Sequence, residues 1–356
     1  MNLQKIKKFT PNEVGKIRAE LKSFANFPYQ IAYINLDNEK DVSAVLKKDR
    51  NFLTILSDKH SYSKKDRIFP INQDENSVFA QYVYQDSIKH NYKRVLDLAT
   101  GSGVIAMAAA KAGDSEVIAT DINNRVKNFI AKNNLLNGVK VKFINSNLFK
   151  NLKGKFDKIT INPPFMPAPN GTFPLHAQGG NLGVENIIEP FFKDVWQHIN
   201  KGGCIQGIFH SFANEKHDTV LDIVNKNIPN GWSYEIKNVF TIKNIPIELY
   251  TTSFSECKEY PAWEKMIKDR QFKYMRFFML TIRNDGKNKL KKEEFSKPRF
   301  YNLIYPPTTL NYLSKKLKIK LLAKPLSEVD YPMIGHLMRL GRYNYYIYLT
   351  LCSLFD

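Results

Sequence analysis

A proline-rich motif directly after a predicted strand carries the residues best suited to chemistry in this sequence. The alternating apolar run 156–161 ends in Asn162, and Pro163, Pro164 and Phe165 follow at once. Prolines end sheet pairing and stiffen the loop that they occupy. The Asn162 side-chain carbonyl and the Pro163 backbone carbonyl are two acceptors, which match the two donor hydrogens of a planar NH2 group. Phe165 adds a flat face for stacking. The motif is therefore suited to holding a planar nitrogen in one orientation.

A glycine-rich turn precedes it, between a predicted buried strand and an alanine-rich helix. The stretch VLDLATGSGVIA covers residues 95–106 and places Gly101 and Gly103 in the turn. Glycines let the backbone approach a ligand closely, and the following helix begins with unpaired N–H donors. Asp121 ends the next predicted strand, where a carboxylate can accept both hydroxyls of a ribose. These features predict a cofactor that contains adenosine, but they do not identify it, because this glycine spacing also fits dinucleotide-binding turns.

The elements that must bring the two motifs together follow from the hydrophobic rhythm after residue 93. The expected strands are KRVLDLA, SEVIATD, VKVKFINS, FDKITI and CIQGIFHSF, and helical stretches separate most of them. This alternation predicts an α/β fold with a mostly parallel, doubly wound sheet. With strand order 3-2-1-4-5, the glycine turn after strand 1 and Asn162 after strand 4 lie at the same edge. The run FKYMRFFMLTIRN, residues 272–284, is expected to form an antiparallel edge strand.

Several of these stretches resemble the class I S-adenosylmethionine-dependent N-methyltransferases with an (N/D/S)PP(Y/F/W) signature, which have a Rossmann-like fold. The resemblance rests on DLATGSG, Asp121, NSNLF and NPPF, and it covers about residues 67–211 with the edge strand to 284. The subset includes HemK-type release-factor glutamine methyltransferases and adenine and guanine N-methyltransferases of RNA. HAQGGNLGVENIIEPFF at 176–192 is similar to the Gly-Gly stretch of HemK-type enzymes, and RIFPINQDENSVFA at 67–80 lies where they carry a substrate loop.

The resemblance implies S-adenosylmethionine as the cofactor, and it implies a role for each motif residue. Asp97 would support the ammonium group of the cofactor, and the two glycines would pass beneath its amino-acid part. Asp121 would hold the ribose, Ile122 would lie against the adenine, and Asn147 would read the adenine amino group. The full set of expected cofactor-binding residues is Asp97, Ala99, Gly101, Gly103, Asp121, Ile122, Asn147, Leu148 and Asn162.

The target nitrogen would be held by the signature itself, through Asn162, Pro163, Pro164 and Phe165. Two departures from the family pattern matter. Ala99 replaces the usual first glycine of the loop, which does little damage. Phe165 stands where HemK-type enzymes usually have tyrosine, and phenylalanine is frequent in the nucleic-acid members, so this weakens a release-factor assignment.

The net charge of the chain indicates which class of substrate to expect. The 356 residues hold 53 Lys or Arg against 34 Asp or Glu, a net charge of +19. This excess favours a polyanionic partner, so we expect RNA first and a translation-factor protein second. The alternative explanation of this charge is that the lysines lie on faces exposed to solvent and bind no partner. Residues 1–65 are expected to form an N-terminal accessory region, 66–286 the methyltransferase domain, and 287–356 a basic, aromatic-rich extension.

Other features exclude several classes of protein. Cys204, Cys257 and Cys352 are scattered, which suits a reducing cytoplasm better than a disulfide framework. We expect no signal peptide, because no apolar segment follows the basic N-terminal stretch. We expect no membrane partner either, since the most apolar run, 343–355, is too short to span a bilayer. No motif for a metal, an NTPase or a nucleophile-elbow hydrolase is present. The oligomeric state stays open.

Several alternatives also stay open. His176 and His210 lie near predicted strand ends and could contact a substrate, although a lone histidine is more often structural. Glu185 and Glu189 could bind a substrate cation, but a place at a helix start explains them better. A small-molecule N-methyltransferase of specialised metabolism, a non-catalytic nucleic-acid-binding module and a dehydrogenase are the rival functions. The NPPF motif has no task in a dehydrogenase.

Overall fold

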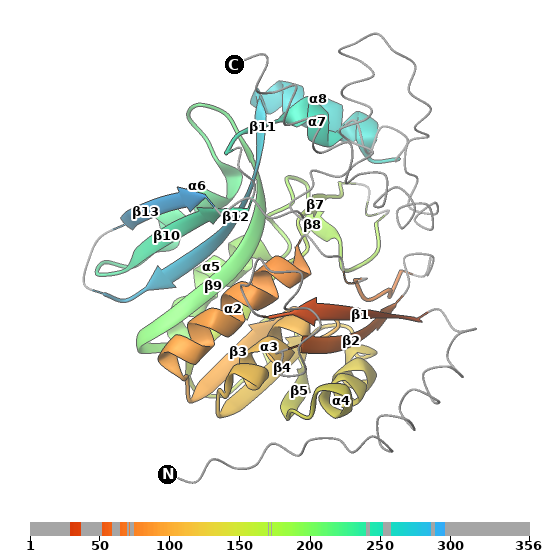
Figure 1. Cartoon of the computed structure of the whole chain (residues 1–356). Helices are drawn as coiled ribbons and strands as arrows, with labels where there is room; N and C mark the ends of the chain where they lie inside the picture. The colour runs from red at the N-terminus through yellow and green to blue at the C-terminus, as the bar shows by residue number, and fades with distance from the viewer. Residues whose placement is uncertain are drawn as a thin grey trace, which may run out of the picture. The chain divides into compact units, whose positions relative to one another are not determined.

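The computed structural model describes residues 29–36, 52–58, 65–69, 71, 75–169, 171, 173–239, 243–251, 258–285 and 289–295 (Figure 1). By its contacts the chain divides into two compact units. The first unit comprises Met1–Pro163, Asp194–Ile208 and Thr281–Gly286. The second comprises Pro164–Lys193, Phe209–Leu280 and Lys287–Asp356.

The first unit is built on a parallel sheet. Its strands are β3 (Arg94–Leu98), β4 (Glu116–Asp121), β5 (Val141–Asn145), β6 (Phe156–Ile161) and the first part of β9 (Ile199–Ala213). The order is β5-β4-β3-β6-β9, and each of these neighbours pairs in parallel. The predicted order 3-2-1-4-5 is therefore confirmed, together with the α/β fold class. Strand residues such as Val95, Leu96 and Ile159 are fully buried, as expected for strands covered on both faces.

The helices that the structure describes in the first unit alternate with its strands. They are α2 (Asn76–His90), α3 (Val104–Ala112) and α4 (Val126–Asn137). Gly113 ends α3 with φ 101° and Gly138 ends α4 with φ 63°, conformations that glycine adopts more readily than other residues. A short 3-10 helix, Val195–Gln197, precedes β9.

An antiparallel hairpin from the N-terminal region packs on α4. It consists of β1 (Tyr29–Asn35) and β2 (Phe52–Asp58). The Asn133 amide donates to the Leu56 carbonyl at 3.1 Å and accepts from the Leu56 N–H at 2.8 Å. Asn137 makes the same pair of bonds with Thr54. Two buried side chains of α4 thus act as pairing partners for the edge of β2. The boundary at residue 65 stays a prediction.

The second unit contains the rest of the sheet in the order β9-β12-β10-β13. Its strands include β10 (Ser233–Asn238), β12 (Tyr274–Arg283) and β13 (Lys289–Phe295), and the short β11 (Ile245–Pro246) pairs antiparallel with β12. The predicted strand at 272–284 is therefore confirmed as β12, but β10 and β13 extend the sheet beyond it. The helices are α5 (Ile188–Asp194), α6 (Thr219–Asn227), α7 (Ile247–Thr251) and α8 (Tyr260–Arg270).

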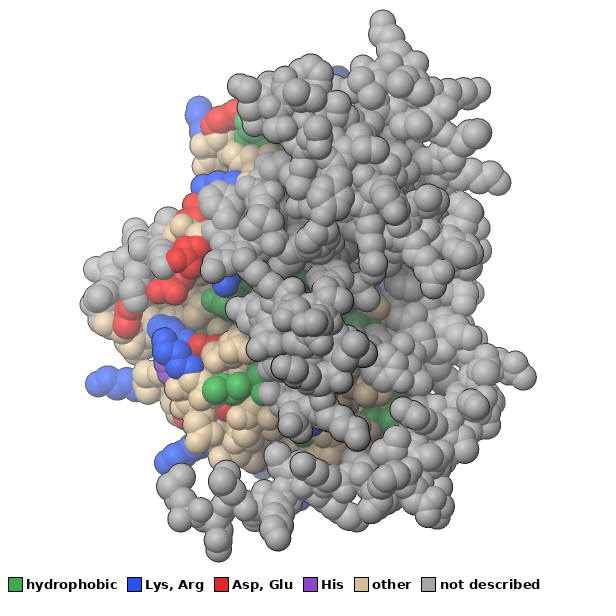
Figure 2. Space-filling model, viewed as in Figure 1, with side chains coloured by type: hydrophobic (Ala, Val, Ile, Leu, Met, Phe, Trp, Pro, Cys, Tyr) green, Lys and Arg blue, Asp and Glu red, His purple; other side chains and the backbone are tan. Residues whose placement is uncertain are grey.

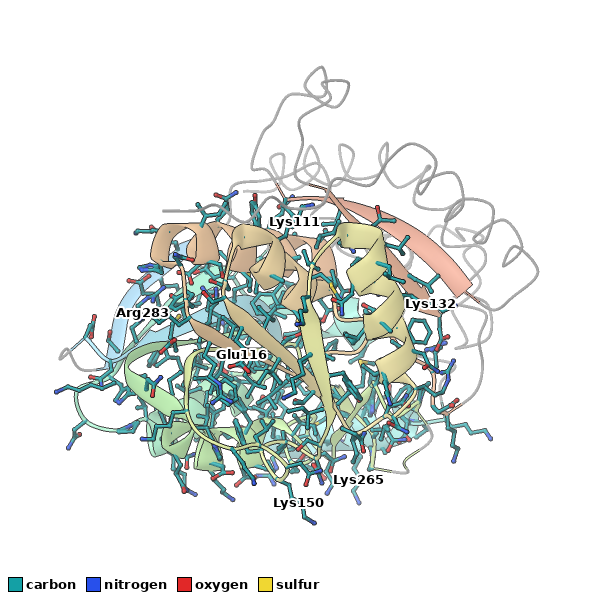
Figure 3. The ribbon with its side chains drawn as sticks, turned by 90° about the horizontal axis from the view of Figure 1, so that it is seen from below. Lys111, Glu116, Lys132, Lys150, Lys265 and Arg283 are labelled. Carbon is teal, nitrogen blue, oxygen red and sulfur yellow. The ribbon has the colours of Figure 1, made fainter. Side chains whose placement is uncertain are left out.

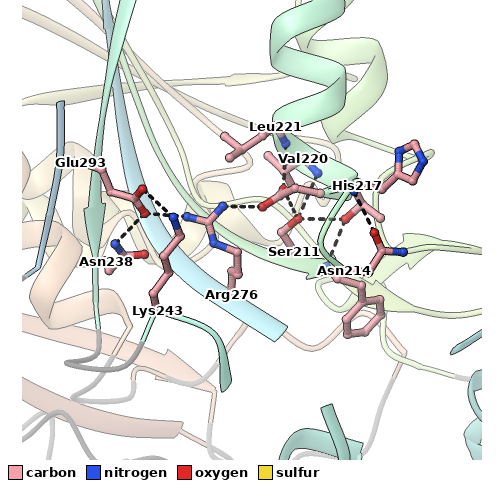
Figure 4. Close-up of polar contacts among 12 residues, drawn as sticks. Ser211, Asn214, His217, Val220, Leu221, Asn238, Lys243, Arg276 and Glu293 are labelled. Carbon is pink, nitrogen blue, oxygen red and sulfur yellow. Dashed lines mark hydrogen bonds and ion pairs between the residues drawn. The ribbon is translucent and has the colours of Figure 1, made fainter. Parts of the chain in front are cut away.

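A buried arginine joins three elements of the second unit (Figure 4). Arg276 of β12 donates to Asp218 at 2.7 Å and to Glu293 of β13 at 2.8 Å. Asp218 also caps α6 by accepting from the Leu221 N–H at 2.9 Å. Parallel pairing of β10 with β13 adds to this connection. Residues beyond the predicted domain boundary at 286 therefore contribute a strand to this unit, and the boundary itself stays a prediction.

Within the described ranges, no helix has the length and apolar character needed to cross a bilayer. Within the same ranges, no group of three or more His, Cys, Asp or Glu side chains could hold a metal ion. The aromatic residues of the extension after 295 lie outside the described residues, as do Cys257 and Cys352.

Candidate functional site

Parallel pairing places the glycine turn and the start of the NPPF motif at one end of the first unit's sheet. Leu98, the last residue of β3, pairs with Ile161, the last residue of β6. The next residues along the two strands are Ala99 and Asn162. The Asn162 side chain is half-buried, and it forms no hydrogen bond with any residue that the structure describes. Its amide is thus available to an incoming group.

The turn after β3 is left-handed at three positions. Ala99, Gly101 and Gly103 have φ angles of 51°, 55° and 84°. A Cβ atom on Gly103 would lie 2.3 Å from Ile130 Cδ1, and the positive φ adds backbone strain for any other residue, so this position favours glycine. A Cβ atom on Gly101 would meet nothing closer than Ile68 Cγ2 at 3.9 Å. The backbone at Gly101 is therefore open, as a cofactor passing close to it would require.

Asp97 stabilises this turn through hydrogen bonds to its side chain. Its side chain is 1% exposed and accepts hydrogen bonds from the Thr100 hydroxyl, the Ala106 N–H and the Thr160 hydroxyl. Burial raises the pKa of Asp97 to about 6, although the hydrogen bonds from Thr100 and Thr160 act in the opposite direction. Asp97 thus links β3, β6 and the start of α3. Its expected contact with the cofactor ammonium stays a prediction.

Asp121 lies at the end of β4 with both carboxylate oxygens oriented by the backbone. Oδ1 accepts from the Asn123 N–H at 2.8 Å, and Oδ2 accepts from the Gly101 N–H at 3.0 Å. A carboxylate oxygen can accept a second hydrogen bond, so two acceptor positions suit the two hydroxyls of a ribose. Burial raises the pKa of Asp121, and the backbone N–H groups lower it in part. This geometry fits the ribose of S-adenosylmethionine.

The neighbouring loops offer an apolar surface and an amide. Ile122 follows Asp121 directly, and its side chain is 53% exposed, which offers an apolar surface that suits an adenine face. Asn145 fixes this loop by donating to the backbone carbonyls of Asp121 and Ile122. Asn147 is exposed two residues later, and Leu148 is left-handed with φ 47°. The adenine contacts expected of these residues stay predictions.

In the second unit, Phe165 lies on a buried histidine. The Phe165 and His210 rings are stacked with centroids 3.7 Å apart and 13° between their planes. The ring centroids of Phe277 and His210 are 4.1 Å apart. Burial lowers the pKa of His210 to about 3, so its ring is neutral at pH 7. The sequence singles out His210 but does not predict this stack, because β9 and the NPPF motif are far apart in the chain.

The loop that follows Phe165 is closely packed. A Cβ atom on Gly183 would lie 2.1 Å from the Phe165 carbonyl oxygen, so only glycine fits there. The fully buried Trp263 of α8 donates from Nε1 to the Pro167 carbonyl at 2.6 Å. Glu185 accepts from the Leu182 N–H, in keeping with a local structural role. No sequence signal points to Trp263.

The remaining candidates have other positions. Glu189 pairs with Lys193 one helical turn later, at 2.8 Å. His176 is half-buried in the loop before β8 (Gln178–Gly180), which pairs with β7 (Met166–Pro167). Pro164 is half-buried between Asn162 and Phe165.

Comparison with known proteins identifies the family. The methyltransferase small domain matches residues 79–226. A Methanocaldococcus jannaschii protein whose assigned name is protein N5-glutamine methyltransferase is 34% identical over 149 residues, which cover 40% of this chain and 73% of the relative. The release factor glutamine methyltransferase of Deinococcus radiodurans is 39% identical over 75 residues, 21% of this chain and 27% of that protein.

A solved structure of a ribosomal protein L11 methylase from Lactobacillus delbrueckii subsp. bulgaricus is similar at 19% identity and a TM-score of 0.33, covering 60% of this chain and 79% of that one. The family of this chain is shown by the sequence matches, chiefly by the Methanocaldococcus jannaschii relative, of which this chain covers 73%. The chain belongs to the methyltransferase small domain family of class I S-adenosylmethionine-dependent N-methyltransferases, and S-adenosylmethionine is its cofactor.

Proposed function

We propose that this chain methylates the side-chain amide nitrogen of a glutamine in a protein, with an exocyclic amino group of an RNA base as the second candidate. The observation that carries the chemistry is the pairing of Leu98 with Ile161. It puts the unbonded Asn162 amide at the sheet end that also holds the glycine turn and Asp121. The relatives named as glutamine methyltransferases reverse the order of substrates that the charge alone suggests.

Residues of the first unit would hold the cofactor and the target nitrogen. Asp121 and the turn at Gly101 would bind the cofactor, which supplies an electrophilic methyl group on a positively charged sulfur. The Asn162 Oδ1 and the Pro163 carbonyl would each accept one N–H of the target. Holding both hydrogens directs the nitrogen lone pair along one axis and reduces the misalignment that slows transfer. The target proton is lost after the methyl group has been gained, so this geometry requires no strong base.

Phe165 would provide the stacking face for the planar target. One face of its ring lies on His210, so a substrate would stack on the opposite face. A neutral His210 adds no charge near the target, in keeping with a role in holding the ring. An amide or an aromatic base can stack on such a face, which explains why Phe165 does not distinguish the two candidate substrates.

The rival functions stay distinguishable. A small-molecule substrate is compatible with the same clamp, and a non-catalytic module is not favoured because Asp121, Gly101, Gly103 and Asn162 are all in place. We expect the reaction to take place in the cytoplasm, in keeping with Cys204 as a buried free thiol.

The test is transfer of tritiated methyl groups from S-adenosylmethionine into a cell lysate that is then separated into protein, RNA and small molecules. We expect label in protein, in an amide that base hydrolysis releases as methylamine. Label confined to RNA would support the second candidate, and label in small molecules alone would overturn a macromolecular substrate. The Asn162→Ala variant serves as the control, because it should transfer far less label to every fraction.

A further inference from the structure

Positive charge is concentrated in one stretch of the first unit. Residues 122–156 contain eight Lys or Arg and no Asp or Glu. The preceding stretch, 76–121, holds four Lys or Arg and five Asp or Glu. Nearly half of the net charge of +19 therefore comes from 35 residues. On the face shown in Figure 2, by contrast, acidic side chains lie among the basic ones.

Seven of these eight cations are exposed and form what we call the lysine surface: Lys127, Lys132, Lys140, Lys142, Lys150, Lys153 and Lys155. The eighth, Arg125, is half-buried and pairs with Asp58 inside the unit. Within the described residues, no ion pair involves Lys140, Lys142 or Lys150, and the same holds for Lys127, Lys153 and Lys155. Figure 3 shows Lys132 and Lys150 pointing outward from the fold. Lys127, Lys140, Lys142, Lys150, Lys153 and Lys155 thus have no acidic partner among the described residues.

The lysine surface is held together by hydrogen bonds between its elements. Asn134 of α4 exchanges two bonds of 2.9 Å with the backbone of Val141, the first residue of β5. Asn151 of the following loop donates to the Asn145 carbonyl at the end of β5. Helix, strand and loop therefore form one connected support within the first unit. The cations have fixed relative positions at their backbone, while their side chains can adapt.

We propose that the lysine surface binds RNA through its phosphate backbone. Lysine side chains that neutralise phosphates release condensed counterions, and this release drives binding without regard to sequence. Base stacking is not expected here, because Phe129, Phe149 and Phe156 are buried and Phe143 is half-buried. Exposed asparagines such as Asn124 and Asn128 add amide donors of the kind that contact phosphates.

An acidic protein is the other polyanion to consider, and the surface suits it less well. Protein interfaces have an apolar centre in which lysine is depleted. Here seven lysines dominate, and the exposed large aliphatic side chains of this stretch are Leu135 on α4 and Ile122. The lysine surface would bind a partner, and the test of this binding measures no methyl transfer. Its failure would therefore be distinct from failure of the proposed function.

The experiment measures binding of a short labelled RNA to the full chain by fluorescence anisotropy over a range of salt concentrations. The Lys142→Gln/Lys150→Gln double variant removes two charges from the lysine surface. Lys89→Gln/Lys93→Gln is the matched control, because it removes two exposed lysines of the same unit outside this stretch. We expect the first variant to lose affinity several-fold and its log–log salt slope to become shallower by about 1.4, since each single-strand contact contributes about 0.7. The control should change little.

Three results would overturn the proposal. One is equal loss of affinity in the two double variants, which would show that only net charge matters. Another is equal affinity of the first variant and the wild type for RNA, which includes the case in which neither binds. The third is equally tight binding of polyglutamate, which would identify an acidic protein as the partner. Matching thermal unfolding of the variants and the wild type guards against loss of folding.

Discussion

Asn162 and Phe165 are three residues apart, but they are constrained in different ways. The Asn162 amide makes no hydrogen bond with the described residues, whereas Phe165 rests on His210 with its ring orientation fixed. A group that must bind a changing partner benefits from free acceptors, and a group that must present a flat face benefits from support. The difference fits the roles that we propose for these two residues.

At the glycine turn, replacement of a glycine by alanine should distinguish an effect on cofactor binding from an effect on folding. Gly101→Ala adds a Cβ atom where the backbone is open, and Gly113→Ala adds one with nothing within 4 Å at the end of α3. Both have positive φ, so each variant should lose at least about 1–2 kcal/mol of unfolding free energy. In calorimetry we expect only Gly101→Ala to lose affinity for S-adenosylmethionine, by about tenfold or 1.4 kcal/mol. Equal affinity in the two variants would contradict the placement of the cofactor.

Asp97 should make stability depend on pH. Its pKa in the folded chain is about 6, above the reference of 3.8 that applies to the unfolded chain. The folded state therefore binds the proton more tightly, and the contribution of Asp97 to stability falls as pH rises from about 4 to 6. In urea unfolding, the difference between wild type and Asp97→Asn should decrease over this interval by about 3 kcal/mol at most. Parallel pH profiles would show that Asp97 does not titrate in this way.

Among the elements, α8 is connected to the loop of the NPPF motif by a hydrogen bond from Trp263. Trp263→Phe keeps an aromatic ring near Phe173 but leaves the buried Pro167 carbonyl without its 2.6 Å donor. The expected loss is about 1–3 kcal/mol of unfolding free energy. Methyl transfer should also slow, since the loop that carries Phe165 loses a support. Phe173→Leu is the control for the ring contact, and it should slow transfer less. Slower methyl transfer by Phe173→Leu than by Trp263→Phe would contradict a role for the hydrogen bond.

A buried ion cluster joins α2, β6 and β12 within the first unit. Lys158 is fully buried and pairs with Asp86 at 2.9 Å, and Arg283 (Figure 3) pairs with the same carboxylate. Burial raises the pKa of Asp86, but the two cations outweigh it and lower the pKa overall. The cluster therefore stabilises the fold above the unfolded-state pKa of Asp86 and loses this effect as pH falls through the lower folded-state pKa.

Removing the shared carboxylate should cost more than removing one cation. Asp86→Asn leaves a buried ammonium without its counter-charge, and we expect a loss of about 3–5 kcal/mol in chemical unfolding. Lys158→Met should cost less, because Asp86 keeps Arg283 and the Tyr92 hydroxyl as partners. A larger effect of Lys158→Met would mean that the other bonds of Lys158, to Val83 and Ser87, dominate.

Sequence reasoning succeeds for elements whose signal is local. The βα rhythm and the glycine turn predict the strand order and the meeting of Ala99 with Asn162 at one sheet end. It fails for β2 and for the bond from Trp263 to Pro167, because each depends on contacts between residues 77 or more positions apart. Asn133 and Asn137 look like ordinary polar helix residues in the sequence. Their task becomes visible only when β2 is seen beside α4.

At the scale of the whole molecule, two regions of the chain contribute much of the net charge of +19. The lysine surface accounts for much of it in the first unit, and the basic extension after 287 adds more. The proposed methyl transfer depends on neither, since the glycine turn, Asp121 and the NPPF motif carry it. Binding of RNA and methylation of a protein amide can therefore be properties of the same chain.

The central claim is that Asn162 holds the target nitrogen beside a cofactor bound by the glycine turn. The most direct measurement compares single-turnover methyl transfer and S-adenosylmethionine affinity in the wild type, Asn162→Ala and the exposed-asparagine control Asn128→Ala. We predict that Asn162→Ala loses transfer by about a hundredfold to a thousandfold, as for other groups that act in the transition state. Its cofactor affinity should stay within a few-fold, and the control should match the wild type. Undiminished transfer by Asn162→Ala would contradict the account.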